Sequence, residues 1–216
     1  MKPIYASNFP YTTPDEADFA AVEAALQELL KPLALQLGIK FIKRLRKWLK
    51  LHTLPKHCLL QQEDQVPVGV YFLLSGSVLV GTDLKGYIQI DHILRTGDFI
   101  LPLKLFSASR SILGMKIAEP VRLLFIDTRR YKLMLKKFPE TAVLTNLWRD
   151  KLEIDDFSRK RELQTMNALE RLSWLYDKWP DCFIVFSDYW IGSYLGLNRE
   201  TVCRNKLKVI KKRKKP

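Results

Sequence analysis

The segment between Pro139 and Pro180 constrains the fold of this 216-residue chain most strongly, because it contains neither proline nor glycine. Those two residues interrupt helices most often, so their absence over so long a segment predicts helix. Its first part, "ETAVLTNLWRDKLEIDDFSRKREL", carries apolar residues at heptad-like spacing. We expect one long helix whose apolar stripe forms a dimer seam from Val143, Leu147, Ile154 and Phe157.

The segment before this helix has a different texture. Residues 58–127 contain six of the nine glycines and short apolar runs such as "VGVYFLLSGSVLVG", "YIQIDHIL" and "VRLLFID". Turn signals recur every eight to twelve residues. This pattern predicts an all-β barrel or sandwich.

Two helices are expected before the β region. "PDEADFAAVEAALQELL" has a helical apolar period that ends near Pro32. "GIKFIKRLRKWLKL" places apolar residues on one side and basic residues on the other. Such a helix lies either on a membrane surface or on a neighbouring domain, and we favour the domain. The chain lacks a long apolar run and an N-terminal apolar signal core, so we expect a cytoplasmic protein with no membrane partner.

The formal charge of +13 is unevenly distributed. Residues 1–38 are net acidic, residues 39–57 hold seven Lys/Arg without Asp or Glu, and residues 197–216 hold nine Lys/Arg against Glu200. A basic segment of this kind is typical of a protein that neutralises phosphates. The alternative for the terminal "KKRKKP" is a solvated tail.

The last fifty residues predict two helices joined by a tight turn. Thr165 is expected to cap a helix over "MNALERLSWLYDKW", and "CFIVF" is expected to form a short strand. Ser187 caps "DYWIGSYLG", and Asn198 caps the helix that follows. Gly192 would allow close helix approach, while the packing residues would be Ile191, Leu195, Leu197 and Val202.

These residues resemble a known family. "IGSYLGLNRETVCR" is similar to the helix-turn-helix of the CRP/FNR family of bacterial transcription regulators, and "LPKHCLLQQEDQVPVGVYFLLSGSVLV" with "RTGDFI" is similar to its cyclic-nucleotide-binding jelly roll. The resemblance covers residues 52–208. It implies an α+β fold with N-terminal helices, a double-stranded β-helix (jelly roll), a long dimerisation helix and a C-terminal winged helix-turn-helix domain. The expected boundaries are an N-terminal extension at 1–38, the β roll at 39–138, the dimerisation helix at 139–164 and the DNA-binding domain with its basic tail at 165–216.

The resemblance also implies how DNA would be contacted. Arginine pairs with guanine and glutamate accepts from cytosine, so Arg199, Glu200 and Arg204 are the expected base readers of a TGTGA-type half-site. The expected DNA-backbone contacts are Ser187, Asn198, Thr201, Lys206, Lys208, Lys211 and Lys212. The expected partners are double-stranded DNA, a second copy of the chain and RNA polymerase. Asn205 and Lys206 depart from the family, which has an apolar anchor there, and a shifted anchor is expected at Leu207, Val209 and Ile210.

The effector site departs from the family pattern as well. Relatives that bind cyclic AMP present a Gly-Glu pair for the ribose and an Arg-Ser-Ala run for the phosphate. This chain has Leu101 and Pro102 at the first position, and neither side chain can accept a hydrogen bond from a hydroxyl. At the second, Arg110 and Ser111 stand one position out of register and are a weak anion-site candidate. Cyclic AMP is therefore not the expected effector, which is otherwise unidentified.

Cofactors and catalysis find little support in the sequence. The three cysteines form no CxxC pair, and the spacing of His52 and His57 is a weak signal for haem, so neither metal nor cofactor is expected. No histidine stands beside a nucleophile, so no catalytic residue is assigned and an enzyme is not expected. The alternative function is a small-ligand-binding or signalling module whose C-terminal domain mediates protein contacts. The presence of both Arg199 and Glu200 favours the DNA-binding regulator.

Overall fold

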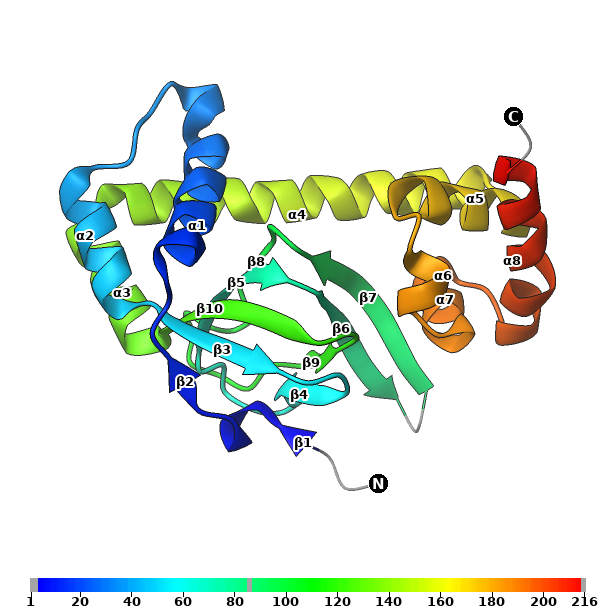
Figure 1. Ribbon diagram of the computed structural model, residues 1–216, viewed down its shortest axis with the longest axis horizontal. Coiled ribbons are helices and arrows are strands. Elements are labelled where there is room, and N and C mark those ends of the chain that lie inside the picture. The colour runs from blue at the N-terminus through cyan, green and yellow to red at the C-terminus, as the bar shows by residue number, and fades with distance from the viewer. Residues whose placement is uncertain (1–3, 85–86, 215–216) are drawn as a thin grey trace. The chain divides into compact units, whose positions relative to one another are not determined.

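The computed structural model describes residues 4–84 and 87–214 (Figure 1). The chain divides into two compact units. The roll unit contains residues 1–80 and 94–152, and the C-terminal unit contains residues 81–93 and 153–216. Both units combine stretches that are far apart in the sequence, because the tip of one β-hairpin belongs to the C-terminal unit.

The predicted all-β region is confirmed, and it forms a two-sheet roll. In the described residues one sheet has the strand order β1-β4-β9-β6-β7 and the other the order β2-β3-β10-β5-β8. The N-terminal extension contributes an edge strand to each sheet, since β1 pairs with β4 and β2 pairs with β3. The strands are β1 (Ile4–Tyr5), β2 (Tyr11–Thr12), β3 (Lys50–Leu54), β4 (Cys58–Gln61), β5 (Gly69–Ser75), β6 (Ser77–Leu84), β7 (Tyr87–Arg95), β8 (Phe99–Ile100), β9 (Gly114–Ile117) and β10 (Val121–Asp127).

The second sheet is buried on both faces because successive side chains of a strand point to opposite sides. Tyr71 and Leu73 of β5 belong to the core between the sheets. Val70 and Phe72 of the same strand belong to a second core, which the helices cover. The continuous apolar run "GVYFLL" is therefore explained by one strand that serves two cores.

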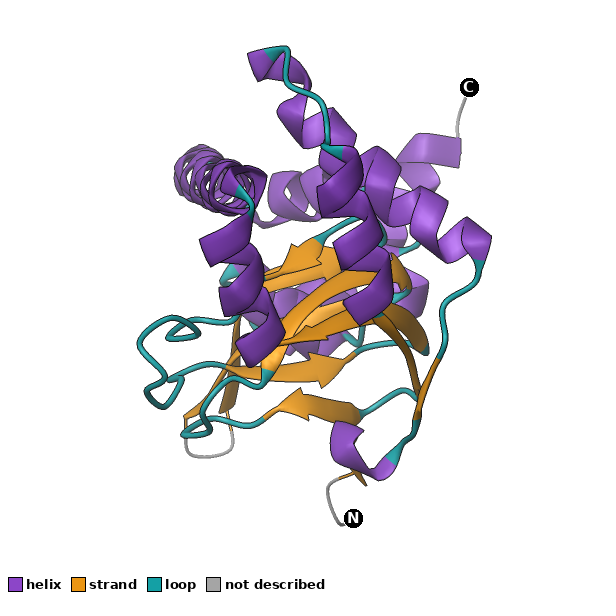
Figure 2. Ribbon diagram, turned by 90° about the vertical axis from the view of Figure 1, so that its left-hand side faces the viewer, coloured by secondary structure: helices purple, strands orange, loops and turns teal. Residues whose placement is uncertain are grey.

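Four helices complete the roll unit: α1 (Glu16–Leu30), α2 (Ile39–Trp48), α3 (Thr128–Lys137) and the first part of α4 (Pro139–Thr165). Single-turn 3-10 helices η1 (Ala6–Asn8) and η2 (Lys31–Leu33) flank α1 and the N-terminal strands. Figure 2 shows α1 and α2 against the strands. The apolar side of α2 is buried through Phe41, Leu45 and Leu49, so its packing on the roll is confirmed.

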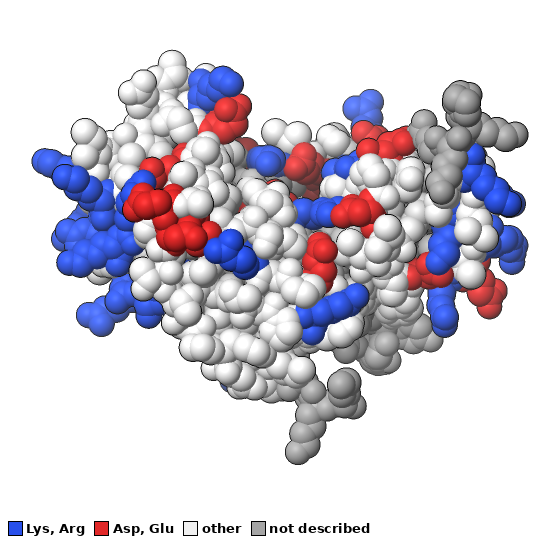
Figure 3. Space-filling view, viewed as in Figure 1, with Lys and Arg blue, Asp and Glu red and all other residues white. Residues whose placement is uncertain are grey.

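Charge complementarity holds α1 in place. Arg46 of α2 donates to Glu23 at 2.6 Å and to Glu16 at 2.7 Å, and Arg122 of β10 donates to the buried Asp18 at 2.9 Å. Figure 3 shows acidic residues gathered over α1 and basic residues over α2. The acidic and basic blocks of the N-terminal sequence are thus two faces of one packing arrangement.

The predicted long helix is confirmed, but its apolar stripe is not uniform. Val143 and Leu147 are partly buried and pack on the helix-covered core of the roll unit. Ile154 and Phe157 are 64% and 67% exposed. The first two residues of the predicted seam are therefore committed to their own unit, and only the last two are available for a second copy.

The remaining helices are α5 (Ala168–Lys178), α6 (Cys182–Val185), α7 (Asp188–Leu195) and α8 (Arg199–Lys214). The predicted cap at Thr165 is wrong, because α4 includes Thr165 and Asn167 caps α5 by accepting from the backbone N–H groups of Leu169 and Glu170. Asn167 is the better cap because the carboxylate of Glu170 closes a capping box on it.

The predicted strand "CFIVF" is also wrong, since this segment forms α6. Its β-forming residues have no neighbouring strand with which to pair, because the described residues after Asp127 form helices and no strands. Cys182 is buried instead, and Phe183 stacks on Tyr176 with ring centroids 5.5 Å apart. For the same reason the β-strands of a wing are absent from the described part of the C-terminal domain.

Candidate nucleic-acid interface

A tight turn joins α7 to α8. Gly196 ends α7 with φ of 65°, a left-handed conformation that suits glycine, and the Leu197 N–H donates to the Gly192 carbonyl at 2.8 Å. A Cβ atom on Gly192 would lie 2.6 Å from the Leu197 carbonyl oxygen. The predicted close approach at Gly192 is confirmed.

Side-chain caps define where both helices begin. The Asn198 Oδ1 accepts from the Thr201 N–H at 2.7 Å, and the Ser187 Oγ accepts from the Trp190 N–H at 3.2 Å. Both predicted caps are confirmed. Each cap satisfies a backbone donor that a helix leaves unpaired in its first turn, at a gain of about 1 kcal/mol.

The inner face of α8 packs on α5 and α7 through Val202 and Val209, which are fully buried. Leu207 is 59% exposed, so the expectation that it anchors the helix is wrong. The polar residue at the family's usual anchor position is accommodated locally, because the Asn205 amide donates to the Thr201 carbonyl at 2.9 Å. Val209 supplies the anchor one turn further along.

The outer face of α8 carries the predicted recognition residues, and all of them are exposed. Glu200, Arg204, Lys208 and Lys211 follow one another at intervals of three or four residues, so they lie along one stripe of the helix. Arg199 adjoins this stripe at its start, as does the exposed Cys203. The three predicted base readers therefore share the first turn and a half of a well-capped, solvent-facing helix.

Lys206 and Thr201 differ from the other predicted backbone contacts. Lys206 Nζ donates to the Asp188 carboxylate at 2.8 and 3.1 Å, which ties α8 to the first turn of α7. Its charge is thus already paired within the helix-turn-helix. Thr201 is only partly exposed, and the side chain of Lys212 lies outside the described residues.

Two arginines that the sequence did not identify support the end of α7. Arg171 donates to the Leu195 carbonyl at 2.9 Å, and Arg159 donates to the Tyr194 carbonyl at 3.1 Å. Positive charge at a helix C-terminus is favourable because the last carbonyls carry partial negative charge. Arg159 also binds Asp156 at 2.7 Å. A lone arginine within a polar helix gives no sequence signal of such a role.

The β-hairpin tip in the C-terminal unit contacts the same helix. The Ser193 Oγ accepts from the Ile90 N–H at 2.8 Å, and Arg159 donates to the Asp91 carbonyl at 2.9 Å. Residues 81–93 are therefore joined to α7 by backbone hydrogen bonds. Their sequence distance from α7 hides this arrangement from pattern analysis.

The weak anion-site candidate in the roll gains no support from the geometry. Arg110 is exposed, while Ser111 is buried and its hydroxyl exchanges hydrogen bonds with the backbone of Leu113. Pro102 is buried, and Leu101 packs on the helix-covered core. Arg110 and Ser111 thus do not converge on a phosphate-sized site.

The structure places the histidines and cysteines as ordinary packing residues. His52 is buried with Nε2 3.1 Å from the Phe9 carbonyl oxygen, and Cys58 and Cys182 are buried thiols. Within residues 4–84 and 87–214, no three His, Cys, Asp or Glu side chains gather in a metal-binding group. No helix in that part of the chain is both long and apolar enough to cross a membrane.

A β roll followed by a long helix and a helix-turn-helix defines the class of fold, and solved structures share it. A candidate transcriptional regulator of the CRP/FNR family from Eubacterium rectale matches with a TM-score of 0.65 at 16% identity, over 82% of this chain and 85% of that one. The c-di-GMP responsive global regulator CLP of Xanthomonas campestris matches with a TM-score of 0.64 at 14% identity, over 81% and 93%.

FixK2 from Bradyrhizobium japonicum matches with a TM-score of 0.62 at 20% identity, over 75% of this chain and 84% of that one. No protein-family model and no curated protein sequence matches the chain. The chain therefore has the fold of CRP/FNR regulators and cyclic-nucleotide-binding proteins, as the sequence resemblance predicted.

Proposed function

We propose that this protein is a sequence-specific DNA-binding transcription regulator that acts as a homodimer. The observation that carries the proposal is the division of α8 into two faces. Val202 and Val209 fix the helix on its unit, while Arg199, Glu200 and Arg204 project into solvent from its first turns. A helix with its N-terminal turns exposed in this way can enter a DNA major groove.

The chemistry of the exposed face suits G·C base pairs. An arginine can donate two hydrogen bonds to guanine O6 and N7, and a glutamate can accept from cytosine N4. Lys208 and Lys211, further along the same stripe, suit phosphate contacts, which add affinity without reading sequence. Lys206 is removed from this set, because its ion pair with Asp188 gives it a bracing role.

Selection of bound sequences from a random double-stranded DNA pool tests the proposal. We expect an enriched two-fold-symmetric motif with G·C pairs in each half-site. Glu200→Ala should change the preferred base at one position per half-site and weaken binding to the best sequence by about 1–3 kcal/mol. The proposal is wrong if no motif is enriched, or if Glu200→Ala leaves the preferred sequence unchanged.

Lys211→Ala is the matched control, because Lys211 lies on the same face but beyond the base-reading turns. It should weaken binding to all sequences alike and reduce the salt dependence by about one charge. Lys206→Ala should instead lower the stability of the helix-turn-helix. Equal effects of Glu200→Ala on all sequences would support a purely electrostatic contact.

Cyclic AMP is not the proposed effector, because Arg110 is exposed and the Ser111 hydroxyl is used by the backbone of Leu113. Calorimetric titration with cyclic AMP should show no saturable heat at micromolar concentrations. The alternative function, a ligand-binding module with a protein-contacting C-terminal domain, would be favoured if the selection recovers no motif. RNA polymerase remains a proposed partner of the DNA-bound dimer.

A further inference from the structure

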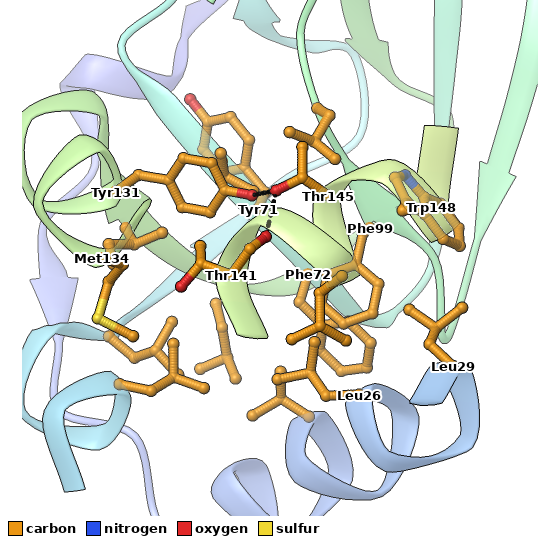
Figure 4. A pocket seen from close by; sticks show the side chains of 18 of the residues that line it. Leu26, Leu29, Tyr71, Phe72, Phe99, Tyr131, Met134, Thr141, Thr145 and Trp148 are labelled. Atoms are coloured by element: carbon orange, nitrogen blue, oxygen red, sulfur yellow. Dashed lines mark hydrogen bonds between the residues drawn. The ribbon is translucent and has the colours of Figure 1, made fainter. Parts of the chain in front are cut away.

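A cavity of about 70 Å³ lies in the roll unit, outside the core between the two sheets (Figure 4). Its walls come from α1 and α2 on one side, the outer face of the β5–β10 sheet, and α3 with the first part of α4. The N-terminal helices thus enclose it. The cavity is unrelated to Arg110 and Ser111, which do not line it.

The wall is apolar except for a few hydroxyl and indole groups. Thr145 Oγ1 donates to the Thr141 carbonyl at 2.6 Å, so the Tyr131 hydroxyl, 2.6 Å from that oxygen, must donate to it. These bonds satisfy Tyr131 and Thr145. Figure 4 shows the three residues as one group, with Trp148 apart from them.

Two polar groups in the wall have no partner. The Thr141 Oγ1 and the Trp148 Nε1 are buried without a hydrogen bond, and their residues are only 4% and 2% exposed. A buried donor left unpaired costs about 1–3 kcal/mol, so native proteins rarely keep two of them in one cavity without a reason. The indole N–H can only donate, so a molecule that satisfies it must carry a hydrogen-bond acceptor.

Charge and size restrict the occupant further. The residues that line the cavity include no Asp, Glu, Lys, Arg or His, and an ionised group buried there would have no counter-charge. A cavity of 150 Å³ accommodates benzene, so one of about half that size takes a molecule of roughly three to five non-hydrogen atoms. The occupant is therefore small and neutral.

We propose that this cavity is a binding site for a small, neutral, largely apolar molecule with one carbonyl-type acceptor, which Trp148 Nε1–H and the Thr141 hydroxyl hold. The site does not depend on DNA binding by α8. It can be tested on the full chain without DNA.

The probe is butan-2-one, which has five non-hydrogen atoms and one carbonyl oxygen. The indole N–H resonances of the five tryptophans are followed by NMR in the ¹⁵N-labelled protein, with Trp148 assigned from Trp148→Phe. We expect a saturable downfield shift of the Trp148 resonance as its N–H gains an acceptor. Propanoate, a charged molecule of the same size, should leave that resonance unchanged.

Two variants separate the cavity from a surface effect. Thr141→Val removes the hydroxyl but keeps the shape, and it should weaken butan-2-one binding about three- to tenfold. Leu26→Phe, which fills space beside α1, should abolish the Trp148 shift. Thr165→Val, a similar substitution at an exposed position of α4, should leave binding unchanged.

The proposal is overturned if butan-2-one does not shift Trp148, if propanoate shifts it equally, or if Leu26→Phe leaves the shift intact. Each variant is first compared with the parent by its thermal unfolding midpoint and its indole spectrum. A variant that has lost the native spectrum is replaced, at position 26 by Leu26→Met and at position 141 by Thr141→Ala, so that every comparison uses folded protein.

Discussion

The two halves of α4 carry the same kind of apolar repeat but use it differently. In the half that belongs to the roll unit, Leu144 and Trp148 are buried, and Val143 and Leu147 pack beside them. In the half that belongs to the C-terminal unit, Ile154 and Phe157 are exposed. A heptad pattern thus locates an apolar stripe, whereas the surrounding chain decides whether that stripe is core or a free surface.

The largest expected effect tests the buried half. Leu144→Ala should lower the free energy of unfolding by about 2–5 kcal/mol, because it leaves a cavity in a packed core. Ile154→Ala should change it by no more than about 0.5 kcal/mol at the same protein concentration, since its side chain is already in water. Urea denaturation followed by circular dichroism measures both. Equal losses would mean that the second half is packed as tightly as the first.

The next effect tests whether the exposed half binds a second copy. In the doubly substituted chain Ile154→Glu with Phe157→Glu, the dimer should weaken by at least about thirtyfold, since burying two carboxylates would oppose association. Light scattering should then give the 25.3 kDa chain mass where the parent gives twice that value. Ser158→Glu, which adds one charge at a neighbouring exposed position, is the control. An unchanged mass in the double variant would place the dimer contact elsewhere.

The smallest effect concerns the charged groups of the second half. Burial raises the pKa of Asp156, but hydrogen bonds from Lys160 and Arg159 outweigh it, and the net pKa lies below the ordinary 3.8. A carboxyl with a lowered folded-state pKa contributes stability that is complete above the ordinary pKa and is lost as the pH falls below it. Asp156→Asn should therefore cost about 1 kcal/mol near neutral pH and reduce the acid-induced loss below about pH 4.

Asp155→Asn is the matched control for this comparison, because Asp155 is its exposed neighbour on the same helix. Acid titration of both variants, followed by urea denaturation at each pH, gives the result. If the two variants behave alike, the ion pairs of Asp156 add nothing to stability. In the first half, the polar side chains Thr141 and Thr145 do not titrate, so their substitution should not alter the pH dependence.

Features set by local chemistry were predictable from the sequence. The caps at Ser187 and Asn198 and the turn at Gly196 depend on residues within four positions of one another, so the motif itself specifies them. The β region was predictable for the same reason, because turn residues divide its strands. The resemblance to CRP/FNR regulators added the order of the units, which local patterns do not provide.

Features set by distant partners were not predictable. "CFIVF" has the composition of a strand, but no strand lies nearby to pair with it. Lys206 looks like a phosphate contact until Asp188 is found beside it, and Arg159 gains its role only where α4, α7 and the hairpin tip meet. The cavity beside Trp148 needs four helices and a sheet to exist, so no segment of the sequence indicates it.

The two faces of α8 also bear on how this protein could evolve. Val202 and Val209 satisfy the requirements of folding, while the exposed residues at 199, 200 and 204 contribute little to the hydrophobic core. Substitutions on the outer face can therefore accumulate with little loss of stability. A duplicated copy of the gene could acquire a new recognition surface in a few steps while the Asn198 cap keeps the helix start unchanged.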